Sequence, residues 1–442
     1  MMFGPAMFPM LWFLAKGLWG EYTKRPPLWL SYEPEAFPEV SYYDSICSVT
    51  HPDIFAGGCE DIKIVGDYAF VSCDPYMKQS NFLTGRTPNT PSGSVYIWNY
   101  VTDETPMTVN LPEDFGEFRP RGLSARQLSD STKIRLFLTN AAKNASIEVY
   151  DFDPETKGLE LFASLRHKDA ILDPAAIAPL SDDQIFLTNT LGYPYSTLGT
   201  LEALSGFPIG TIGYMNLTDM TNITGKSVGG VTTPVGIEFV DETLYVASFQ
   251  YGIYGYRLYI PPADLDPELV AENLSLSRMH FYPGETVYRT PYLPTHLSYS
   301  EELGGIVSAA VPSYSGEIKS WYGRSSSSWA GLLVDRQQED GKPLVVSDSV
   351  TVGLRAADRK WQTLFWDKGG ENFSGLKSMS VANGRRFGVS PHQAGVLVCK
   401  TNGLEAVEVP ETVEKDDAPA QAKERQRNKD KLEHMYLAKD EL

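Results

Sequence analysis

The chain has 442 residues, of which 42% are apolar and 21% charged, a balance typical of a globular protein that buries a sizeable core. This length fits two or three average domains or one large all-β domain. With 38 basic against 56 acidic residues, the net charge of -18 argues against nucleic acid and anionic membrane surfaces as partners.

The N-terminus contains an apolar segment, Met7 to Ala15, that is too short to cross a bilayer as a helix. It resembles a secretory signal peptide or a retained signal-anchor, although no Lys or Arg precedes it and Pro9 interrupts it. Residues 1–20 are therefore expected to be a signal or an anchor. Membrane contact is expected through this segment alone, and only if it is retained.

A pair of adjacent carboxylates stands between two cysteines in the stretch GCEDIKIVGDYAFVSCD. Glu60 and Asp61 are the carboxylates, and they lead directly into a predicted hairpin. The four cysteines of the chain are Cys47, Cys59, Cys73 and Cys399. In an oxidising compartment they are disulfide candidates rather than catalytic thiols, and composition leaves all three pairings open.

From this point the sequence repeats one pattern six times: a turn signal, a short β-rich run ending in a small residue, and a second run that usually contains aromatics. The first runs are AFVS (69–72), LFLT (136–139), IFLT (185–188), LYVAS (244–248), IVSAA (306–310) and RFGVS (386–390). The second runs are SVYIWNY (94–100), SIEVYDF (146–152), TIGYMNL (211–217), GIYGYRL (252–258), EIKSWYG (317–323) and GVLVCK (395–400).

Six repeats of roughly 50 to 80 residues, each with three or four strands, predict an all-β fold, a six-bladed β-propeller over residues 40–402. The first strand of each repeat is expected to line the central axis, so that ligands meet its mouth. Residues 413–442 are rich in charge and have no core pattern, which indicates a flexible arm.

The C-terminus and the glycosylation acceptors indicate the lumen of the endoplasmic reticulum. The last four residues, Lys439, Asp440, Glu441 and Leu442, spell KDEL, a retention signal that a receptor reads. The N-x-S/T acceptors are Asn144, Asn216, Asn222, Asn273 and Asn372. We therefore expect a lumenal glycoprotein with the KDEL receptor as a partner.

The spacing of these elements resembles the paraoxonase/arylesterase family, six-bladed propellers related to strictosidine-synthase-like and gluconolactonase-like proteins. The anchors are GCEDIKIVGDYAFVS, FRPRGLS (118–124), TTPVGIEFVDETLYVAS (232–248) and SGLKSMSVANGRRFGVSPHQAGVLVCK (374–400), within a resemblance that covers about residues 40–402. It implies that Cys47 and Cys399 bond to close the ring. Cys59 and Cys73 then remain and are expected to bond each other across one hairpin.

Members of that family hold two calcium ions on the axis and use them to hydrolyse lactones and esters. The resemblance places Glu60 and Asp61 at the first ligand of each ion. Three roles remain open for the two carboxylates: capping strand ends near the axis, holding a structural cation, or taking part in catalysis. Calcium is therefore a possible cofactor, with Asp173 as a third carboxylate ligand.

At the other ligand positions the resemblance fails. Asp173-Pro174 stands where the family has Asn-Asp, Val235 where it has an axial Asn, Thr295-His296 where it has Asp-Asn, and Arg121 where it has a histidine over the calcium. Glu60, Asp173 and His296 are too few for calcium, which takes six to eight oxygen ligands. We therefore expect that the hydrolase chemistry is lost and that no cofactor is needed.

The favoured hypothesis is a metal-independent enzyme that binds a hydrophobic small molecule. It resembles the hetero-Diels–Alderases of fungal tropolone sesquiterpenoid pathways, which implies dehydration to a quinone methide and then cycloaddition. Arg121, His296, Asp173 and Glu60 are the candidates for binding and proton transfer. Aromatic segments at 191–199 and 280–294 are expected to wall the pocket. The alternatives are a calcium-dependent lactonase or arylesterase and a non-enzymatic lumenal binding scaffold.

Overall fold

The computed structural model describes residues 47–56, 58–75, 92–111, 116–194, 202, 208–218, 224–241, 243–257, 286–288, 290–312, 325–335 and 359–400. The expected signal or anchor, the charged arm with its KDEL sequence, and the acceptors Asn222 and Asn273 lie outside these residues. Within them, no helix is long and apolar enough to span a membrane.

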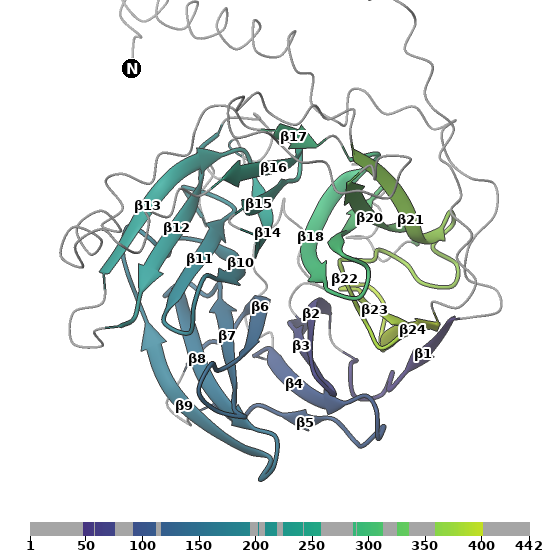
Figure 1. The fold of residues 1–442 in the computed structure, drawn as a ribbon, viewed down its shortest axis with the longest axis horizontal. Helices are drawn as coiled ribbons and strands as arrows, with labels where there is room; N and C mark the ends of the chain where they lie inside the picture. The colour runs from purple at the N-terminus through teal and green to yellow at the C-terminus, as the bar shows by residue number, and fades with distance from the viewer. Residues whose placement is uncertain are drawn as a thin grey trace, which may run out of the picture. The chain divides into compact units, whose positions relative to one another are not determined.

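The described strands form six four-stranded antiparallel sheets around a central axis, which confirms the predicted six-bladed β-propeller (Figure 1). Blade 1 is β2 (Cys59–Val65), β3 (Tyr68–Cys73), β4 (Ser94–Asn99) and β5 (Met107–Thr108). Blade 2 is β6 (Pro120–Gln127), β7 (Ile134–Asn140), β8 (Ser146–Asp153) and β9 (Gly158–Leu165). Blade 3 is β10 (Pro174–Pro179), β11 (Gln184–Asn189), β12 (Gly210–Asn216) and β13 (Thr224–Val231).

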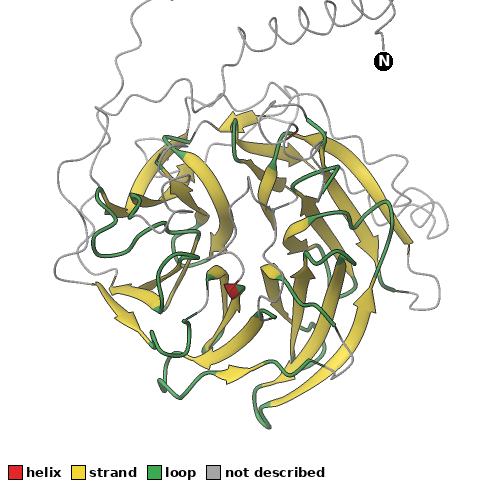
Figure 2. Ribbon diagram, turned by 180° about the vertical axis from the view of Figure 1, so that it is seen from behind, coloured by secondary structure: helices red, strands yellow, loops and turns green. Residues whose placement is uncertain are grey.

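The second half of the ring repeats this order. Blade 4 is β14 (Pro234–Val240), β15 (Thr243–Ser248), β16 (Gly252–Arg257) and β17 (Thr286–Tyr288). Blade 5 is β18 (Leu293–Ser300), β19 (Gly305–Val311), β20 (Ser328–Asp335) and β21 (Arg359–Asp367). Blade 6 is β22 (Ser378–Ala382), β23 (Arg385–Val389) and β24 (Val396–Lys400), completed by β1 (Cys47–Thr50). Figure 2 shows the same ring from behind, with strands as its main regular structure.

The ring closes because the first strand of the chain is the outermost strand of the last blade. β1 pairs with β24 in a register that sets Cys47 opposite Cys399, and a disulfide joins the two. A second disulfide joins Cys59 and Cys73, which face each other on β2 and β3. Both predicted pairings are confirmed.

The six first runs of the sequence repeat are the second strands of the blades, and each innermost strand is the segment just before its run. The second runs form the third strands β4, β8, β12, β16 and β24. In blade 5 the run expected at 317–323 lies outside the described residues, and the third strand is β20. Apolar clusters fill the space between each blade and its neighbours, so the core is divided among the six interfaces.

The innermost strands begin with one five-residue segment that was not recognised in the sequence. Its copies are CEDIK (59–63), PRGLS (120–124), PAAIA (174–178), PVGIE (234–238), PTHLS (294–298) and LKSMS (376–380). In the first five copies a bulge follows the first residue, and the fourth residue of every copy is a buried Ile, Leu or Met. Proline suits the first place because the inner edge of a blade leaves its peptide nitrogen without a strand partner.

A short polar side chain at the end of most second strands holds the loop that precedes the inner strand. Asn140 accepts a hydrogen bond from the Arg119 N–H, and Asn189 accepts one from the Asp173 N–H. The hydroxyl of Ser248 donates to a carbonyl in the corresponding loop of blade 4. Blade 1 has the Cys59–Cys73 disulfide at this place. These contacts fix where the first residues of the inner strands, and hence the mouth of the axis, are located.

Candidate functional site

The third residue of the repeated segment determines how much space is left on the axis. These residues are Asp61, Gly122, Ala176, Gly236, His296 and Ser378. Neighbouring inner strands approach so closely that a Cβ on Gly122 would lie 2.1 Å from the Ala175 carbonyl oxygen. A Cβ on Gly236 would lie 3.0 Å from the Cα of His296. Small residues in four blades therefore leave room for two large polar side chains, Asp61 and His296.

Asp61 is completely buried and receives hydrogen bonds from four donors. Its Oδ1 accepts from the Ile62 N–H and the Ser378 hydroxyl, each at 2.8 Å. Its Oδ2 accepts from the Leu123 N–H at 2.8 Å and lies 2.9 Å from Nε2 of His296. The donors come from blades 1, 2, 5 and 6, so this single carboxylate joins four blades.

The surroundings keep Asp61 ionised. Burial by itself raises the pKa of the carboxyl group, because it disfavours the charged form. The electrostatic attraction and hydrogen bond of His296, the charge of Lys63 and the hydrogen bond from Leu123 outweigh burial and hold the pKa of Asp61 below its usual value.

His296 is oriented by Asp61. The side chain of His296 is 6% exposed, and its Nε2 faces the carboxylate, which can only accept a hydrogen bond. Nε2 therefore carries a proton, and in the neutral ring the lone pair resides on Nδ1. A carboxylate that holds one ring nitrogen while the other is left for a reacting proton is the arrangement of a general base.

A second charged pair lies on the axis and was not foreseen. The Lys63 ammonium donates to the Glu238 carboxylate at 2.8 Å and to the Leu297 carbonyl at 2.7 Å. Burial by itself lowers the pKa of Lys63, but the charges of Glu238 and Asp61 and the hydrogen bond to Glu238 raise it above its ordinary value. Lys63 and Glu238 are both the fifth residue of the repeated segment.

Arg121 and Asp173 form an ion pair between blades 2 and 3, at the start of the inner strands. Nη1 of Arg121 lies 3.1 Å from Oδ1 of Asp173. The Arg121 side chain is 27% exposed and that of Asp173 2%, so the guanidinium reaches solvent while its anchor is buried. Asn189 holds the backbone of Asp173 in place.

Glu60 is a buried carboxylate of the first inner strand, and one of its oxygens has no partner among the described residues. It is 5% exposed, and the oxygen without a partner is Oε1. Glu60 is the second residue of the repeated segment, as are Arg121 of blade 2 and Lys377 of blade 6. In blades 3, 4 and 5 the second residues are Ala175, Val235 and Thr295. The mouth of the axis therefore has a charged half and a half with small or apolar side chains.

The structure places the four candidate catalytic residues in three groups at one end of the axis. Arg121 bonds Asp173, His296 bonds Asp61, and Glu60 shares its position in the repeat with Arg121. Among the described residues, Asp173 and His296 form no hydrogen bond or ion pair with each other.

The residues around Asp61 do not fit a calcium ion. Its oxygens face peptide N–H groups, a hydroxyl and an imidazole N–H, which are donors, whereas calcium takes oxygen ligands. The Lys63 ammonium adds a positive charge nearby. In the part of the chain that the structure describes, no three His, Cys, Asp or Glu side chains come together in a group that could hold a metal.

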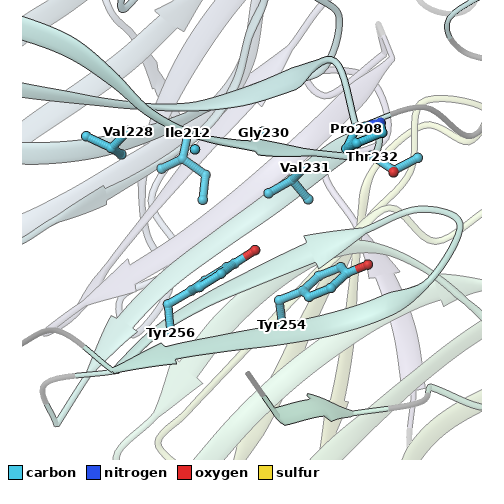
Figure 3. Close-up of a pocket in the computed structure, with 9 residues that line it drawn as sticks. Pro208, Ile212, Val228, Gly230, Val231, Thr232, Tyr254 and Tyr256 are labelled. Atoms are coloured by element: carbon cyan, nitrogen blue, oxygen red, sulfur yellow. The ribbon is translucent and has the colours of Figure 1, made fainter. Parts of the chain in front are cut away.

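A pocket of about 210 Å³ lies between the outer strands of blades 3 and 4, away from the axis (Figure 3). Ile212, Val228 and Val231 form one wall, and the rings of Tyr254 and Tyr256 form the other. The two rings stack at 6.1 Å. The pocket is therefore a different site from the charged side chains on the axis.

The aromatic segments expected to wall a pocket are described in part. Tyr193 is 53% exposed, whereas Tyr288 and Tyr292 are buried in the core, where Tyr292 stacks on Trp366. None of these three tyrosines lines the pocket between blades 3 and 4. Residues 195–199 and 280–285 of these segments lie outside the described residues.

No family model matches the chain, and no curated protein matches it in sequence. Among solved structures it is similar to a catalytically inactive variant of virginiamycin B lyase from Staphylococcus aureus with quinupristin, at 9% identity and a TM-score of 0.38 over 80% of this chain and 98% of that chain. It is also similar to the computationally designed Ika8 protein, at 11% identity and a TM-score of 0.34 over 77% and 83% of the two chains. Likeness of this degree supports no conclusion about function.

Proposed function

We propose that this protein is an enzyme that performs acid–base chemistry on a hydrophobic small molecule at the mouth of the propeller axis, without a metal ion. The observation that carries the proposal is the Asp61–His296 pair, with Nε2 held 2.9 Å from a buried carboxylate. Burying an oriented histidine at the end of the axis is not a favourable way to gain stability, but the arrangement is well suited to proton transfer.

The neighbouring residues supply the other parts of such a reaction. His296 removes a proton through Nδ1 while Asp61 stabilises the resulting imidazolium. Arg121 binds the oxygen that gains negative charge, a phenolate or an enolate, and Asp173 keeps the guanidinium in position. Glu60, whose Oε1 has no partner, acts in its protonated form: it gives its proton to the departing hydroxyl group, which leaves as water, and becomes a carboxylate.

The finer proposal is a dehydration that gives a reactive quinone methide, followed by cycloaddition in the same site. It draws on the resemblance to the paraoxonase-like propellers and to the hetero-Diels–Alderases. The split mouth supports it, because a charged half suits a phenol or hydroxyl group and a half with small or apolar residues suits a hydrocarbon skeleton. The endoplasmic reticulum lumen, indicated by KDEL, is the proposed location.

The Kemp elimination of nitrobenzisoxazole tests the acid–base site without knowledge of the substrate. A base removes the ring C–H proton as the N–O bond breaks, and the ring opens to a nitrile and a coloured nitrophenolate. We expect turnover by the wild type that falls at least about 100-fold in His296→Gln, the usual contribution of a general base. Arg121→Met should also lower the rate, because it removes the group that binds the phenolate.

A second histidine–carboxylate pair in the molecule provides a matched control. Nε2 of His51 lies 3.0 Å from Oδ1 of Asp103, but Asp103 is 65% exposed and the pair lies away from the axis. His51→Gln should therefore keep the wild-type rate. Equal rates in wild type, His296→Gln and His51→Gln would overturn the proposal.

One observation favours a second function. A buried carboxylate oxygen without a partner, as in Glu60, is also typical of a cation ligand. A calcium-dependent lactonase or arylesterase would hydrolyse phenyl acetate or a simple lactone, with activity lost in EDTA and restored by calcium. A binding scaffold would turn over neither these esters nor nitrobenzisoxazole.

A further inference from the structure

We propose that the Lys63 ammonium takes the place of a structural divalent metal ion on the propeller axis, where it holds neighbouring blades together. The inference concerns what holds the blades together, and it does not depend on the proposed function. It starts from the misfit between the axial donor set and calcium.

The position of Lys63 is the first argument. Its side chain starts on blade 1 and reaches the Glu238 carboxylate on blade 4 and the Leu297 carbonyl on blade 5, at 2.8 and 2.7 Å. The Lys63 side chain is 9% exposed and that of Glu238 is 16% exposed, so both charges are largely removed from solvent. A carboxylate and a backbone carbonyl are also oxygen ligands of the type that calcium takes.

The balance of charge on the axis is the second argument. Asp61 and Glu238 bring two negative charges, and Lys63 is close enough to both to be stabilised by each. His296 bonds Asp61 directly. Asp61 and Glu238 therefore each have a hydrogen-bond partner that the chain itself supplies.

The reach of the network is the third argument. Asp61 bonds groups of blades 2, 5 and 6, and Lys63 bonds groups of blades 4 and 5. Together the two side chains of β2 tie five of the six blades at the centre of the ring. Removing the ammonium alone would leave the largely buried Glu238 carboxylate without this partner, which is strongly destabilising.

Thermal melting of the purified full-length protein tests the inference, with EDTA or calcium chloride added. The wild-type Tm should be the same in both, and elemental analysis should find no stoichiometric metal. Lys63→Met should lower the Tm on the order of 10 °C. Calcium should then raise the Tm of this variant, because the Glu238 carboxylate and the Leu297 carbonyl lose the ammonium and can bind the ion in its place.

Two further variants provide controls. In Lys63→Met/Glu238→Met both partners are replaced, so the loss of Tm should be smaller than in Lys63→Met and the calcium response should shrink. Lys133→Met removes a surface lysine that lies 3.9 Å from Glu160 and should leave the Tm unchanged.

The wild-type measurement decides the matter even if Lys63→Met does not fold. A wild type that EDTA destabilises, together with stoichiometric calcium, would overturn the inference. So would a Lys63→Met variant that melts like Lys133→Met, or one whose Tm calcium does not raise.

Discussion

Asp61 accepts hydrogen bonds from more blades than any other side chain described above, and its environment favours the ionised carboxylate. Every polar group around it is a donor, and the His296 hydrogen bond and the Lys63 charge favour the carboxylate. Asparagine has the same shape but cannot replace it. Its amide nitrogen is a hydrogen-bond donor and would face groups that are themselves donors.

Asp61→Asn should therefore lower the free energy of unfolding by about 3–5 kcal/mol, as expected when one member of a buried charged pair is removed. Ser378→Ala removes a single hydrogen bond to the same carboxylate and should cost about 1.5–3 kcal/mol. Urea unfolding followed by tryptophan fluorescence measures both. Equal losses in the two variants would show that the charge of Asp61 contributes nothing beyond that hydrogen bond.

Glu148 on β8 is a buried carboxyl group whose pKa is raised, whereas that of Asp61 is lowered. It is fully buried, and neither oxygen has a hydrogen-bond partner among the described residues. Burial raises the pKa of Glu148, and nearby Ser146, Ser164 and Arg166 offset only part of that rise. The folded protein thus favours the protonated acid more than the unfolded chain does.

This raised pKa makes stability depend on pH in a defined direction. The contribution of Glu148 is fully present below the pKa of the unfolded chain and is lost as the pH rises through the folded pKa. Glu148→Gln, which stays neutral, should be more stable than the wild type at pH 7, because no buried group then has to become charged. At about pH 4 the gain should vanish. Melting curves at the two pH values test this, and a gain that is independent of pH would contradict it.

The repeated inner-strand segment and the polar contact behind it form the element on which the site is built. In blade 3, the Asn189 side chain accepts from the Leu172 and Asp173 N–H groups and donates to the Ala170 carbonyl. It thereby connects the end of β11 to the start of β10. The same contact sets the position of Asp173, and through Asp173 that of Arg121.

Asn189→Ala should lower the free energy of unfolding by roughly 2–5 kcal/mol, because it leaves several buried polar groups without partners. It should also weaken binding of the nitrophenolate product, since Arg121 loses its fixed anchor. Asn99→Ala is the control, because Asn99 bonds two N–H groups in an exposed turn. Equal effects of the two substitutions would argue against the positioning role.

The two disulfides differ in the loop that each one closes. Cys47 and Cys399 are separated by 352 residues, and Cys59 and Cys73 by 14. In the chain-entropy model a bond that closes a longer loop stabilises more, because it restricts the unfolded chain more.

Replacing both Cys47 and Cys399 with Ser should therefore cost about 6 kcal/mol, against about 3 kcal/mol for the Cys59/Cys73 double variant. Chemical unfolding of the two variants under oxidising conditions measures the difference. A larger loss for the short loop would show that the hairpin bond acts on the folded state, where it joins the start of the first inner strand to β3.

For the whole propeller, the location in the secretory pathway can be tested through its surface. Asn144 lies in the exposed turn between β7 and β8, whereas Asn216 and Asn372 are half-buried. An acceptor must be accessible to be modified, so Asn144 is the first of these three that we expect to carry a glycan. Disulfides of this kind also persist in an oxidising compartment.

Expression of the full chain in a eukaryotic cell tests this expectation. Asn144→Gln should remove one glycan, seen as a gel shift that endoglycosidase treatment abolishes. Deleting Lys439–Leu442 should release the protein into the medium, because the retention receptor no longer binds it. A protein without glycans that stays in the cytosol would contradict the proposed location.

The fold and its closure were predictable from the sequence because their signals are local or repeated. Alternating β-rich runs separated by turn residues indicate strands, and six copies indicate six blades. The resemblance to a propeller family added the pairing of Cys47 with Cys399. The candidates Glu60, Arg121, Asp173 and His296 were also found in this way, because each stands at or beside the start of an inner strand.

The partners of these residues were visible only once the ring had closed. Lys63 and Glu238 are 175 residues apart, and Asp61 and Ser378 are 317 apart. Nothing in the pattern of one strand indicates which residue of another blade will face it across the axis. That choice depends on strand register, on bulges and on the small residues that let the inner strands approach. The charge network at the centre is therefore a property of the assembled propeller, while the blades themselves follow from the order of residues along the chain.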